Sequence, residues 1–328
     1  MGSIALYIYH GKKGWDVSKL VNEIIWGGRK GTLPRYIEVT LNDDDTKGQG
    51  RMKLDVENGY TCVFKWKGKE KFRGIIMRQS QSEKKELKFK AYDECIYLAN
   101  SKDSFSYKNK TASEIFRNCI KRAGLTCGKV AKITTKLSSL QKKDSYFADC
   151  LLEALSKTYK KTKHRYYIMA DGGKVSLLRR KEQTTQWVLE VGANVSGYSY
   201  SKSIEKIKTR FRIYSDKGKV VYEKKNAKLE KKIGRFIAIQ TLNEKQNDAQ
   251  IRKLVNSMIE ENGYPEENLS VTTLGIISAI AGGCLYVIIP HLDIKRTFYI
   301  DEDKHTFKGE THTMSLTLNF ATDIGSAG

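Results

Sequence analysis

Short runs of alternating apolar and polar residues fill the first hundred positions of this chain. A period of two is typical of half-buried β-strands, and polar or glycine-containing turns separate the runs. A turn is expected at Gly27-Gly28 and another around Lys67-Gly68. The segment therefore predicts a β-meander of about six strands, enough for a small barrel or sandwich. The clearest runs are residues 4–9, 24–26, 35–41, 61–66, 71–78 and 86–92.

The period changes between residues 108 and 185. Thr111 and Glu114 have the spacing of a helix capping box, and the apolar residues that follow share one helical face up to Gly124. A second helix is predicted from Asp144. Residues 165–170 and 174–179 flank Asp171-Gly172-Gly173 and predict a β-hairpin. This segment therefore predicts a compact α/β insert.

Strand patterns return after residue 186, with one basic run and one helix among them. Residues 224–235 are nearly all basic and predict an exposed loop, and a helix is expected from Asn243 to Gly263. The uncharged run 271–290 has nearly the length of a membrane span. Its glycines and Pro290 instead favour two strands joined by a small-residue loop, so no stable membrane insertion is expected. The predicted strands are residues 187–190, 197–200, 206–214, 219–223, 236–240, 284–289, 297–300 and 312–320.

Two stretches suggest a duplicated architecture. Residues 61–92 and 285–320 each have the pattern of three strands with polar turns, although they share no residue-level identity. The fold class is therefore expected to be mainly β with an α+β insert. We expect three domains: a β domain at 1–107, the insert at 108–185, and a second β domain with one helix at 186–328.

Composition adds a strong charge asymmetry. The chain of 328 residues has 59 Lys and Arg against 37 Asp and Glu, a net charge of +22. Such a charge favours an anionic partner, and a lysine-rich surface without a specific partner explains it equally well. None of the six cysteines forms a C-x-x-C pair. We therefore expect most of them to be buried free thiols in a reducing compartment.

Candidate chemistry is sparse. Asp301, Asp303, His305 and His312 lie close in sequence, but exposed turn residues are favoured over a metal site there. The glycine-rich run 27–31 superficially resembles a phosphate-binding loop, yet it lacks the terminal Lys-Ser/Thr and is interpreted as a turn. No catalytic residue, metal or cofactor is expected.

A second basic run deserves comparison with nucleic-acid binders. Residues 157–167 interleave cations with aromatic residues, as single-strand binders do. The end of a helix followed by the start of a strand explains the same run, because lysine is favoured at helix C-termini. A solvated surface is the favoured interpretation, and nucleic acid is not expected as a partner.

Several weak motifs in a fixed order carry a resemblance over nearly the whole chain. Through these motifs the sequence resembles the XkdQ/YqbQ family of baseplate hub proteins from contractile phage tails and phage-tail-like particles. These hubs look like the late-control D proteins. The motifs are Ile25-Trp26-Gly27-Gly28, Phe72-Arg73-Gly74-Ile75-Ile76, Ala91-Tyr92-Asp93, Thr111-Ala112-Ser113-Glu114-Ile115, Cys119 to Leu125, Ser201 to Lys208, and His312-Thr313-Met314-Ser315-Leu316.

The resemblance implies a structural, non-enzymatic role. It implies two tube-like β-barrel domains flanking the small α/β domain, and a homotrimer that adapts a hexameric tail tube to a trimeric central spike. The implied partners are the tail tube or a tube-initiator protein, the central spike, baseplate wedge proteins and a tape-measure protein. It also implies assembly in the bacterial cytoplasm and a final place in the baseplate of a virion or tail-like particle.

Specific residues follow as candidates for these contacts. We expect residues 276–283 to be a loop that a neighbouring subunit buries. The alternative functions are a tail-associated cell-wall hydrolase and a basic nucleic-acid-binding protein. The ring-interface candidates are Phe72, Ile75, Ile76, Met314, Leu316 and Leu318, and the basic-loop candidates are Lys224, Lys225, Lys231, Lys232 and Arg235.

Overall fold

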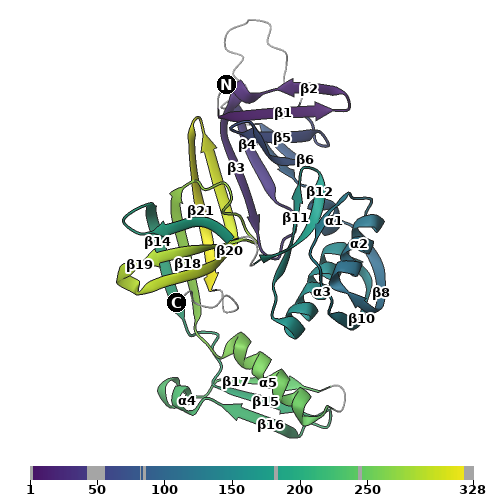
Figure 1. The fold of residues 1–328 in the computed structure, drawn as a ribbon, viewed down its shortest axis with the longest axis vertical. Coiled ribbons are helices and arrows are strands. Elements are labelled where there is room, and N and C mark those ends of the chain that lie inside the picture. The colour runs from purple at the N-terminus through teal and green to yellow at the C-terminus, as the bar shows by residue number, and fades with distance from the viewer. Residues whose placement is uncertain are drawn as a thin grey trace, which may run out of the picture. The chain divides into compact units, whose positions relative to one another are not determined.

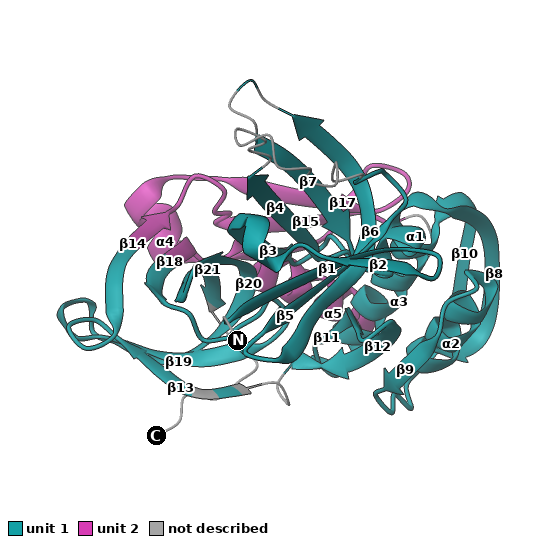
Figure 2. Cartoon of the chain, turned by 90° about the horizontal axis from the view of Figure 1, so that it is seen from above, with its two compact units in different colours: residues 1–198, 270–328 teal, residues 199–269 magenta. Residues whose placement is uncertain are grey.

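The computed structural model describes residues 3–42, 56–81, 83, 86–180, 184–242 and 246–320. The fold is mostly β with an α+β insert, as the sequence predicts (Figure 1). The chain divides into two compact units (Figure 2). Unit 1 comprises residues 1–198 and 270–328, and unit 2 comprises residues 199–269. The three-domain boundaries expected from the sequence stay a prediction.

One large sheet contains thirteen strands from both ends of the chain. Along its main path the order is β14-β18-β21-β20-β3-β4-β7-β6-β5-β1-β2, and β13 joins through β19. The N-terminal strands are β1 (Ile4–His10), β2 (Lys13–Asp16), β3 (Val21–Arg29), β4 (Tyr36–Asn42), β5 (Thr61–Trp66), β6 (Lys69–Gln81) and β7 (Glu86–Tyr92). The others are β13 (Thr184–Glu190), β14 (Val195–Ser203), β18 (Glu266–Leu274), β19 (Cys284–Ile289), β20 (Ile294–Lys308) and β21 (Thr311–Phe320).

The sheet consists of two copies of one strand order. In the first repeat the neighbours run β1-β5-β6-β7-β4-β3, and in the second they run β13-β19-β20-β21-β18-β14. Both repeats carry a register shift at the same place, between Ile76 and Arg78 in β6 and between Ile300 and Glu302 in β20. They differ at one end, where β1 pairs antiparallel with β5 while β13 pairs parallel with β19. The three-strand pattern expected at 61–92 and 285–320 is confirmed.

The two repeats are joined by hydrogen bonds between β3 and β20. Glu302 of β20 pairs with Arg29, and the antiparallel register continues to Phe307 opposite Ile24. Gly27 and Gly28 therefore lie inside a strand, and the turn expected there is wrong. The turn comes later, where Gly31 adopts a φ of +86°.

The α/β insert has its own core. Its strands are β8 (Lys102–Thr111), β9 (Cys127–Val130), β10 (Lys136–Tyr146), β11 (Tyr166–Asp171) and β12 (Lys174–Arg179), and its helices are α1 (Cys95–Asn100), α2 (Ala112–Arg122) and α3 (Phe147–Thr162). The predicted capping box is confirmed, because Thr111 and Glu114 bond reciprocally at the start of α2. The β11–β12 hairpin is also confirmed. The helix expected from Asp144 begins at Phe147 instead, since Asp144 still belongs to β10 and has a φ of +49°.

Unit 2 is a small α/β body inserted between β14 and β18 (Figure 2). It comprises the sheet β16-β15-β17 and two helices. Phe211 and Ile213 of β15 form its core with Val255 of α5. A capping box of Asn247 and Gln250 starts α5, and the earlier start expected at Asn243 lies outside the described residues. Its elements are β15 (Arg210–Tyr214), β16 (Val220–Lys225), α4 (Ala227–Ile233), β17 (Ile237–Thr241) and α5 (Asp248–Asn262).

Two other expectations concern single segments. The basic run 224–235 is exposed as predicted, but it is not a loop, because residues 227–233 form α4 with Asn226 as its N-cap. The uncharged run 271–290 comprises the end of β18, a loop and β19, as expected. Among the described residues, no helix is both long enough and apolar enough to cross a bilayer.

Candidate functional site

A buried ion pair ties the two repeats together at the β3–β20 junction. The guanidinium of Arg35 donates to both carboxylate oxygens of Asp303, over 2.7 and 2.6 Å. Their side chains are 8% and 0% exposed. The residue beside the pair must be glycine, because a Cβ at Gly28 would lie 2.5 Å from Nη1 of Arg35. Losing either partner would leave an uncompensated charge in the core.

Two histidines extend this buried network. The Nε2 of His305 lies 3.0 Å from the carbonyl oxygen of Ala279, and its Nδ1 lies 2.9 Å from Nε2 of His312. The carbonyl accepts only, so His305 carries its proton on Nε2 and accepts a hydrogen bond from His312 at Nδ1. Burial lowers the pKa of His305 to about 4 and that of His312 to about 3. Both rings are therefore neutral at pH 7.

These positions correct the interpretation of Asp303 and His305 as exposed turn residues. Asp303 is 1% exposed and His305 is fully buried. Arg35, Trp26 and the loop 276–283 contact these two side chains. The structure brings Asp303, His305 and His312 together, as their closeness in sequence allowed. Within the described part of the chain, no group of three His, Cys, Asp or Glu residues is arranged to hold a metal ion.

The loop 276–283 is held by its own chain. The backbone N–H of Ala281 donates to Asp303 over 2.6 Å, and that of Gly282 donates to the carbonyl of Ile300 over 3.1 Å. Ala279, Gly282 and Gly283 are buried within the chain itself. This loop therefore needs no neighbouring subunit to bury it.

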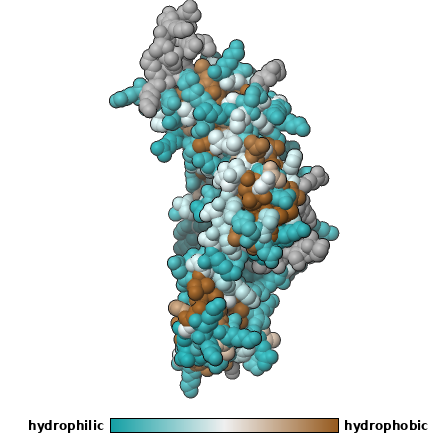
Figure 3. All heavy atoms as spheres, turned by 90° about the vertical axis from the view of Figure 1, so that its left-hand side faces the viewer, coloured by the Kyte–Doolittle hydropathy of each residue, from teal (hydrophilic) through white to brown (hydrophobic). Residues whose placement is uncertain are grey.

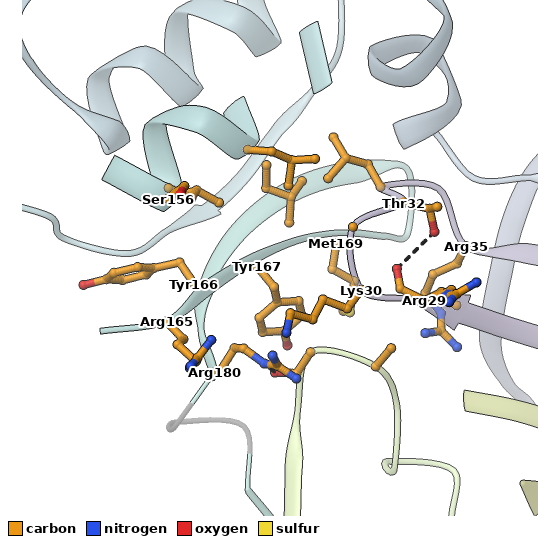
Figure 4. A pocket seen from close by; sticks show the side chains of 18 of the residues that line it. Arg29, Lys30, Thr32, Arg35, Ser156, Arg165, Tyr166, Tyr167, Met169 and Arg180 are labelled. Atoms are coloured by element: carbon orange, nitrogen blue, oxygen red, sulfur yellow. Dashed lines mark hydrogen bonds between the residues drawn. The ribbon is translucent and has the colours of Figure 1, made fainter. Parts of the chain in front are cut away.

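A pocket of about 410 Å³ lies where the β3–β4 turn, α3, β11 and the loop 276–283 meet. Figure 4 shows Lys30, Arg165 and Arg180 gathered along one side of it. Its wall also contains Leu33 and leucines of α3, so cationic and apolar surfaces share one cavity. The other lining residues are Gly28, Arg29, Gly31, Thr32, Arg35, Leu152, Leu155, Ser156, Tyr159, Tyr166, Tyr167, Ile168, Met169, Ala281 and Gly282.

Two of these cations, Lys30 and Arg180, share one carboxylate. Asp301 lies 3.4 Å from Nζ of Lys30 and 3.2 Å from a guanidinium nitrogen of Arg180. Arg180 is also fixed by the carbonyls of Gly282 and Ile300, over 3.1 and 2.8 Å. Burial, together with the charges of Arg180 and Arg165, lowers the pKa of Lys30 against the pull of Asp301. The pocket therefore concentrates positive charge in partly desolvated surroundings.

Two runs that we interpreted from the sequence as a turn and as a solvated surface both line this pocket. Gly28, Lys30 and Gly31 come from the glycine-rich run, and residues 159 and 165–167 come from the run of cations and aromatics. The first is still not a phosphate-binding loop. Two backbone donors of this turn are already used: the N–H of Lys30 donates to the carbonyl of Asp301 and that of Thr32 to the carbonyl of Arg29. The hydroxyl of Thr32 bonds to the same Arg29 carbonyl (dashed in Figure 4).

The predicted interface side chains lie elsewhere. Phe72, Ile76, Met314, Leu316 and Leu318 are at most 4% exposed and face the core of this chain, while Ile75 is half-buried. Their side chains are therefore core residues rather than a free surface, because they occupy the inward positions of β6 and β21. Whether the strands that carry them form a ring wall stays a prediction.

The basic-loop candidates are exposed, as expected, and belong to unit 2. Lys224 and Lys225 end β16, Lys231 and Lys232 belong to α4, and Arg235 follows that helix. Arg235 pairs with Glu230 over 2.7 Å. Their role as a contact surface stays a prediction.

The cysteine expectation holds for five of the six residues. None of the six forms a disulfide in the described part of the chain, and only Cys127 is exposed. Burial raises the pKa of the Cys62 thiol, so it is protonated and inert at neutral pH.

Sequence reasoning missed the Arg35–Asp303 pair and the pocket. The available signal was the pair of glycines in an otherwise apolar strand, which marks a close approach by another group. Nothing in the local pattern around Arg35 indicates a carboxylate 268 positions away.

Comparisons with known proteins agree with this architecture. A sequence model of the YQBQ-like family matches residues 24–319. The chain belongs to the YQBQ-like family. It is 32% identical to the phage-like element PBSX protein XkdQ of Bacillus subtilis (strain 168) over 296 residues, which are 89% of this chain and 90% of that protein. It is 31% identical to YqbQ of the same organism over 295 residues, 89% of each chain.

Solved tail proteins share the fold of this YQBQ-like chain. The 43 kDa tail protein of prophage MuSo2 from Shewanella oneidensis has a TM-score of 0.71 at 14% identity, over 96% of this chain and 97% of that one. The tail protein of Neisseria meningitidis MC58 has the same TM-score at 12% identity, over 96% of both chains. The chain is therefore a YQBQ-like protein that shares the fold of solved phage tail proteins.

Proposed function

We propose that this YQBQ-like chain is a non-enzymatic baseplate hub. In this proposal three copies form a ring that adapts the hexameric tail tube to the trimeric central spike. A duplicated chain suits that task, because three copies of a two-repeat chain present six similar repeats to a hexamer.

The observation that carries the proposal is the β3–β20 junction. Within one chain, the edge strand of the first repeat pairs with the second half of the long strand of the second repeat. The same junction between chains would pair β14, the edge strand of the second repeat, with the second half of β6. Repeating both junctions in turn closes a ring and removes its free edges.

The exposed fractions at these strands support that pairing. Residues 78–81 of β6 occupy the place that 302–305 occupy in β20, counted from the shared register shift, and they are exposed. β14 stands at one end of the described sheet and is exposed along most of its length. Nearby, Trp187 and Val188 of β13 and Tyr198 of β14 are exposed apolar residues. Figure 3 shows apolar patches on one face of the chain.

Solved structures with related folds support the proposed partners. A type VI secretion component of Escherichia coli, described as similar to the T4 tail proteins gp27 and gp5, has a TM-score of 0.56 at 9% identity over 93% of this chain. A chain of the Francisella PdpA–VgrG complex has a TM-score of 0.57 at 11% identity. We propose the tail tube or tube-initiator, central spike, wedge and tape-measure proteins as neighbours, with assembly in the bacterial cytoplasm before incorporation into the baseplate. The exposed basic residues of unit 2 are proposed to contact acidic neighbours.

Cysteine cross-linking tests the proposed junction between chains. Gln79→Cys in β6 and Lys202→Cys in β14, the positions equivalent to Asp303 and Gly28, are combined in a Cys127→Ser background, which removes the exposed native thiol. The side chain of Lys202 is 54% exposed, so this change is tolerated. Neighbouring strands lie about 5 Å apart, so mild oxidation is expected to give dimers and trimers on a non-reducing gel.

The single-cysteine variants are the controls, and Gln79→Cys with Ser201→Cys is a second double variant at the neighbouring register position. Each single variant alone is expected to stay uncross-linked. If neither double variant yields a disulfide between chains while the purified protein is trimeric, the proposed strand pairing is wrong and the trimer forms through another surface.

A further inference from the structure

We propose that β17 is a docking edge, to which a neighbouring protein adds an extended strand. That strand would be uncharged in its centre, with apolar side chains at alternate positions and acidic residues at the end beside Phe236. The inference concerns residues of unit 2 alone and uses none of the strands of the proposed ring. It rests on the proposed function only in excluding one pairing between copies.

The first argument is that one edge of β17 is free. In the sheet β16-β15-β17, β17 pairs in parallel with β15 and with no other described strand (Figure 1). At one end of this ladder, the N–H of Arg210 donates to the carbonyl of Phe236 over 3.1 Å. At the other end, the N–H of Leu242 donates to the carbonyl of Tyr214 over 2.8 Å. Every second residue of β17 therefore bonds to β15, counted from Phe236.

The residues between them direct their backbone groups to the other side. Ala238 and Gln240 use their N–H and C=O groups for β15, so those of Ile237 and Ile239 point away from the sheet. Within the described residues, no hydrogen bond reaches the backbone of Ile237 or Ile239. Such a row of free donors and acceptors is the template onto which another strand adds.

The second argument is the apolar surface along the same edge. Phe236, Ile237 and Ile239 are 44%, 39% and 65% exposed. Residues 236–241 contain no charged residue, no proline and no glycine. A strand laid along this edge would remove these side chains from water and pair the free backbone groups at the same time.

The opposite edge of the same sheet provides a comparison within the fold. β16 also exposes two apolar side chains, since Val220 and Val221 are 49% and 44% exposed. It carries Glu223, Lys224 and Lys225, however, and a register shift interrupts its pairing with β15. Charged side chains and bulges are common means by which proteins prevent pairing at a free edge. β16 has both and β17 has neither, which indicates that the β17 edge is kept open for a partner.

The occupant is a different protein rather than a second copy. Pairing β17 with the β16 of another copy would use the edge that charges and a register shift protect. Pairing β17 with another β17 is two-fold, whereas the proposed ring is three-fold. The chain also has a net charge of +22, and the exposed Lys231 and Lys232 come shortly before β17. This charge repels a second copy and attracts a strand with acidic residues at the end beside Phe236.

The first test measures amide hydrogen exchange in the full chain, residue by residue and at low protein concentration. The amides of Ile237 and Ile239 are expected to exchange about a hundredfold faster than those of Ala238 and Gln240, because only the latter bond to β15. The four residues are consecutive in one strand, so the slow pair is the internal control for the fast pair.

The second test uses a randomised octapeptide library selected on the immobilised full chain. We expect enriched peptides with Val, Ile or Phe at alternate positions and Asp or Glu at one end. A bound peptide is expected to slow exchange at the amides of Ile237 and Ile239. Ile239→Lys should weaken its binding about tenfold, the equivalent of 1.4 kcal/mol, in fluorescence anisotropy. Val221→Lys, at an exposed apolar position of β16, is the matched control and should leave binding unchanged.

Four outcomes would overturn the proposal. The first is slow exchange at Ile237 and Ile239 in the chain alone, which would show that the chain itself covers the edge. The second is slowing that follows protein concentration without peptide, which would identify a second copy as the occupant. The third is no enrichment, or enriched peptides that leave both amides fast. The fourth is equal loss of binding in Ile239→Lys and Val221→Lys.

These results are separable from a failure of the hub proposal. Ile239 lies outside the strands of the proposed ring, so Ile239→Lys is expected to keep the trimer and the cross-link between β6 and β14. Loss of the cross-link in the parent chain would contradict the ring and leave the exchange and peptide measurements at β17 interpretable.

Discussion

The two long strands β6 and β20 are equivalent in the duplicated sheet but have different surroundings. In β20, residues 302–307 pair with β3 on one side and β21 on the other, and Asp303 and His305 are buried. In β6, residues 78–81 pair with β7, and Gln79 and Gln81 at the equivalent positions are exposed. Polar residues therefore occupy these positions in both repeats, and in β20 the strand β3 and the loop 276–283 both lie against them.

This difference indicates what the first repeat lacks. Where β3 pairs with β20, the sheet contains a buried ion pair and two neutral histidines. Where β6 continues past its register shift, polar side chains and strand edge face solvent in the single chain. A strand from another copy is the partner that would make the two repeats alike.

Removing the buried guanidinium should have the largest effect on stability. Arg35→Ala leaves the Asp303 carboxylate uncompensated, so the free energy of unfolding should fall by about 3–5 kcal/mol. Gln79→Ala, at the position equivalent to Asp303, should change it by about 0.5 kcal/mol or less in the monomer. Urea titration measures both. Equal effects of the two changes would show that the repeats do not differ as described.

A methyl group at the junction should have an intermediate effect. The Cβ of Gly27→Ala would lie 2.8 Å from the backbone oxygen of Asp303, so β3 and β20 must shift apart. The expected loss is about 1–3 kcal/mol. Gly197→Ala in β14, where a Cβ meets nothing within 4 Å, is the matched control and should be neutral or slightly stabilising. Thermal unfolding compares the two variants, and a neutral Gly27→Ala would contradict the close approach.

The smallest expected effect is a loss of stability on acidification, caused by protonation of His305. Its pKa is about 4 in the folded chain and ordinarily 6.5, so the unfolded chain binds more protons between these values. The stability it contributes is present above pH 6.5 and is lost as the pH falls towards 4, by up to about 1.4 kcal/mol per pH unit. His305→Gln removes this dependence.

The difference between wild type and His305→Gln is the quantity to measure. Burial raises the pKa of Asp93 to about 7, so that residue contributes with the opposite sign and stabilises the fold as the pH falls from 7. Both proteins contain Asp93, and the subtraction removes it. Wild type should lose more stability than the variant between pH 6.5 and 5.5. Parallel curves would show that His305 is not held neutral by burial.

Local features could be predicted from the sequence because their causes are local. The Thr111–Glu114 capping box and the β11–β12 hairpin depend on residues a few positions apart, and both were predicted correctly. The prediction of a loop at 224–235 was wrong because Asn226 starts a helix, which the lysines of this run alone do not indicate.

Features made by distant residues could not be predicted in this way. Gly27 and Gly28 were interpreted as a turn, whereas they are required in a strand because Arg35 reaches Asp303 beside them. The interpretation of Asp303 and His305 as exposed failed for the same reason. The pocket combines two runs about 130 positions apart, and each alone suggested a different ligand.

The mass of the purified chain in solution tests directly whether three copies assemble. Sedimentation velocity over a range of protein concentrations compares the species with the 37.4 kDa chain. The account predicts a species of three times that mass at high concentration, and a shift towards the monomer when Ser80→Pro disrupts the exposed end of β6. A chain that stays monomeric at every concentration, or a trimer that Ser80→Pro leaves intact, would contradict it.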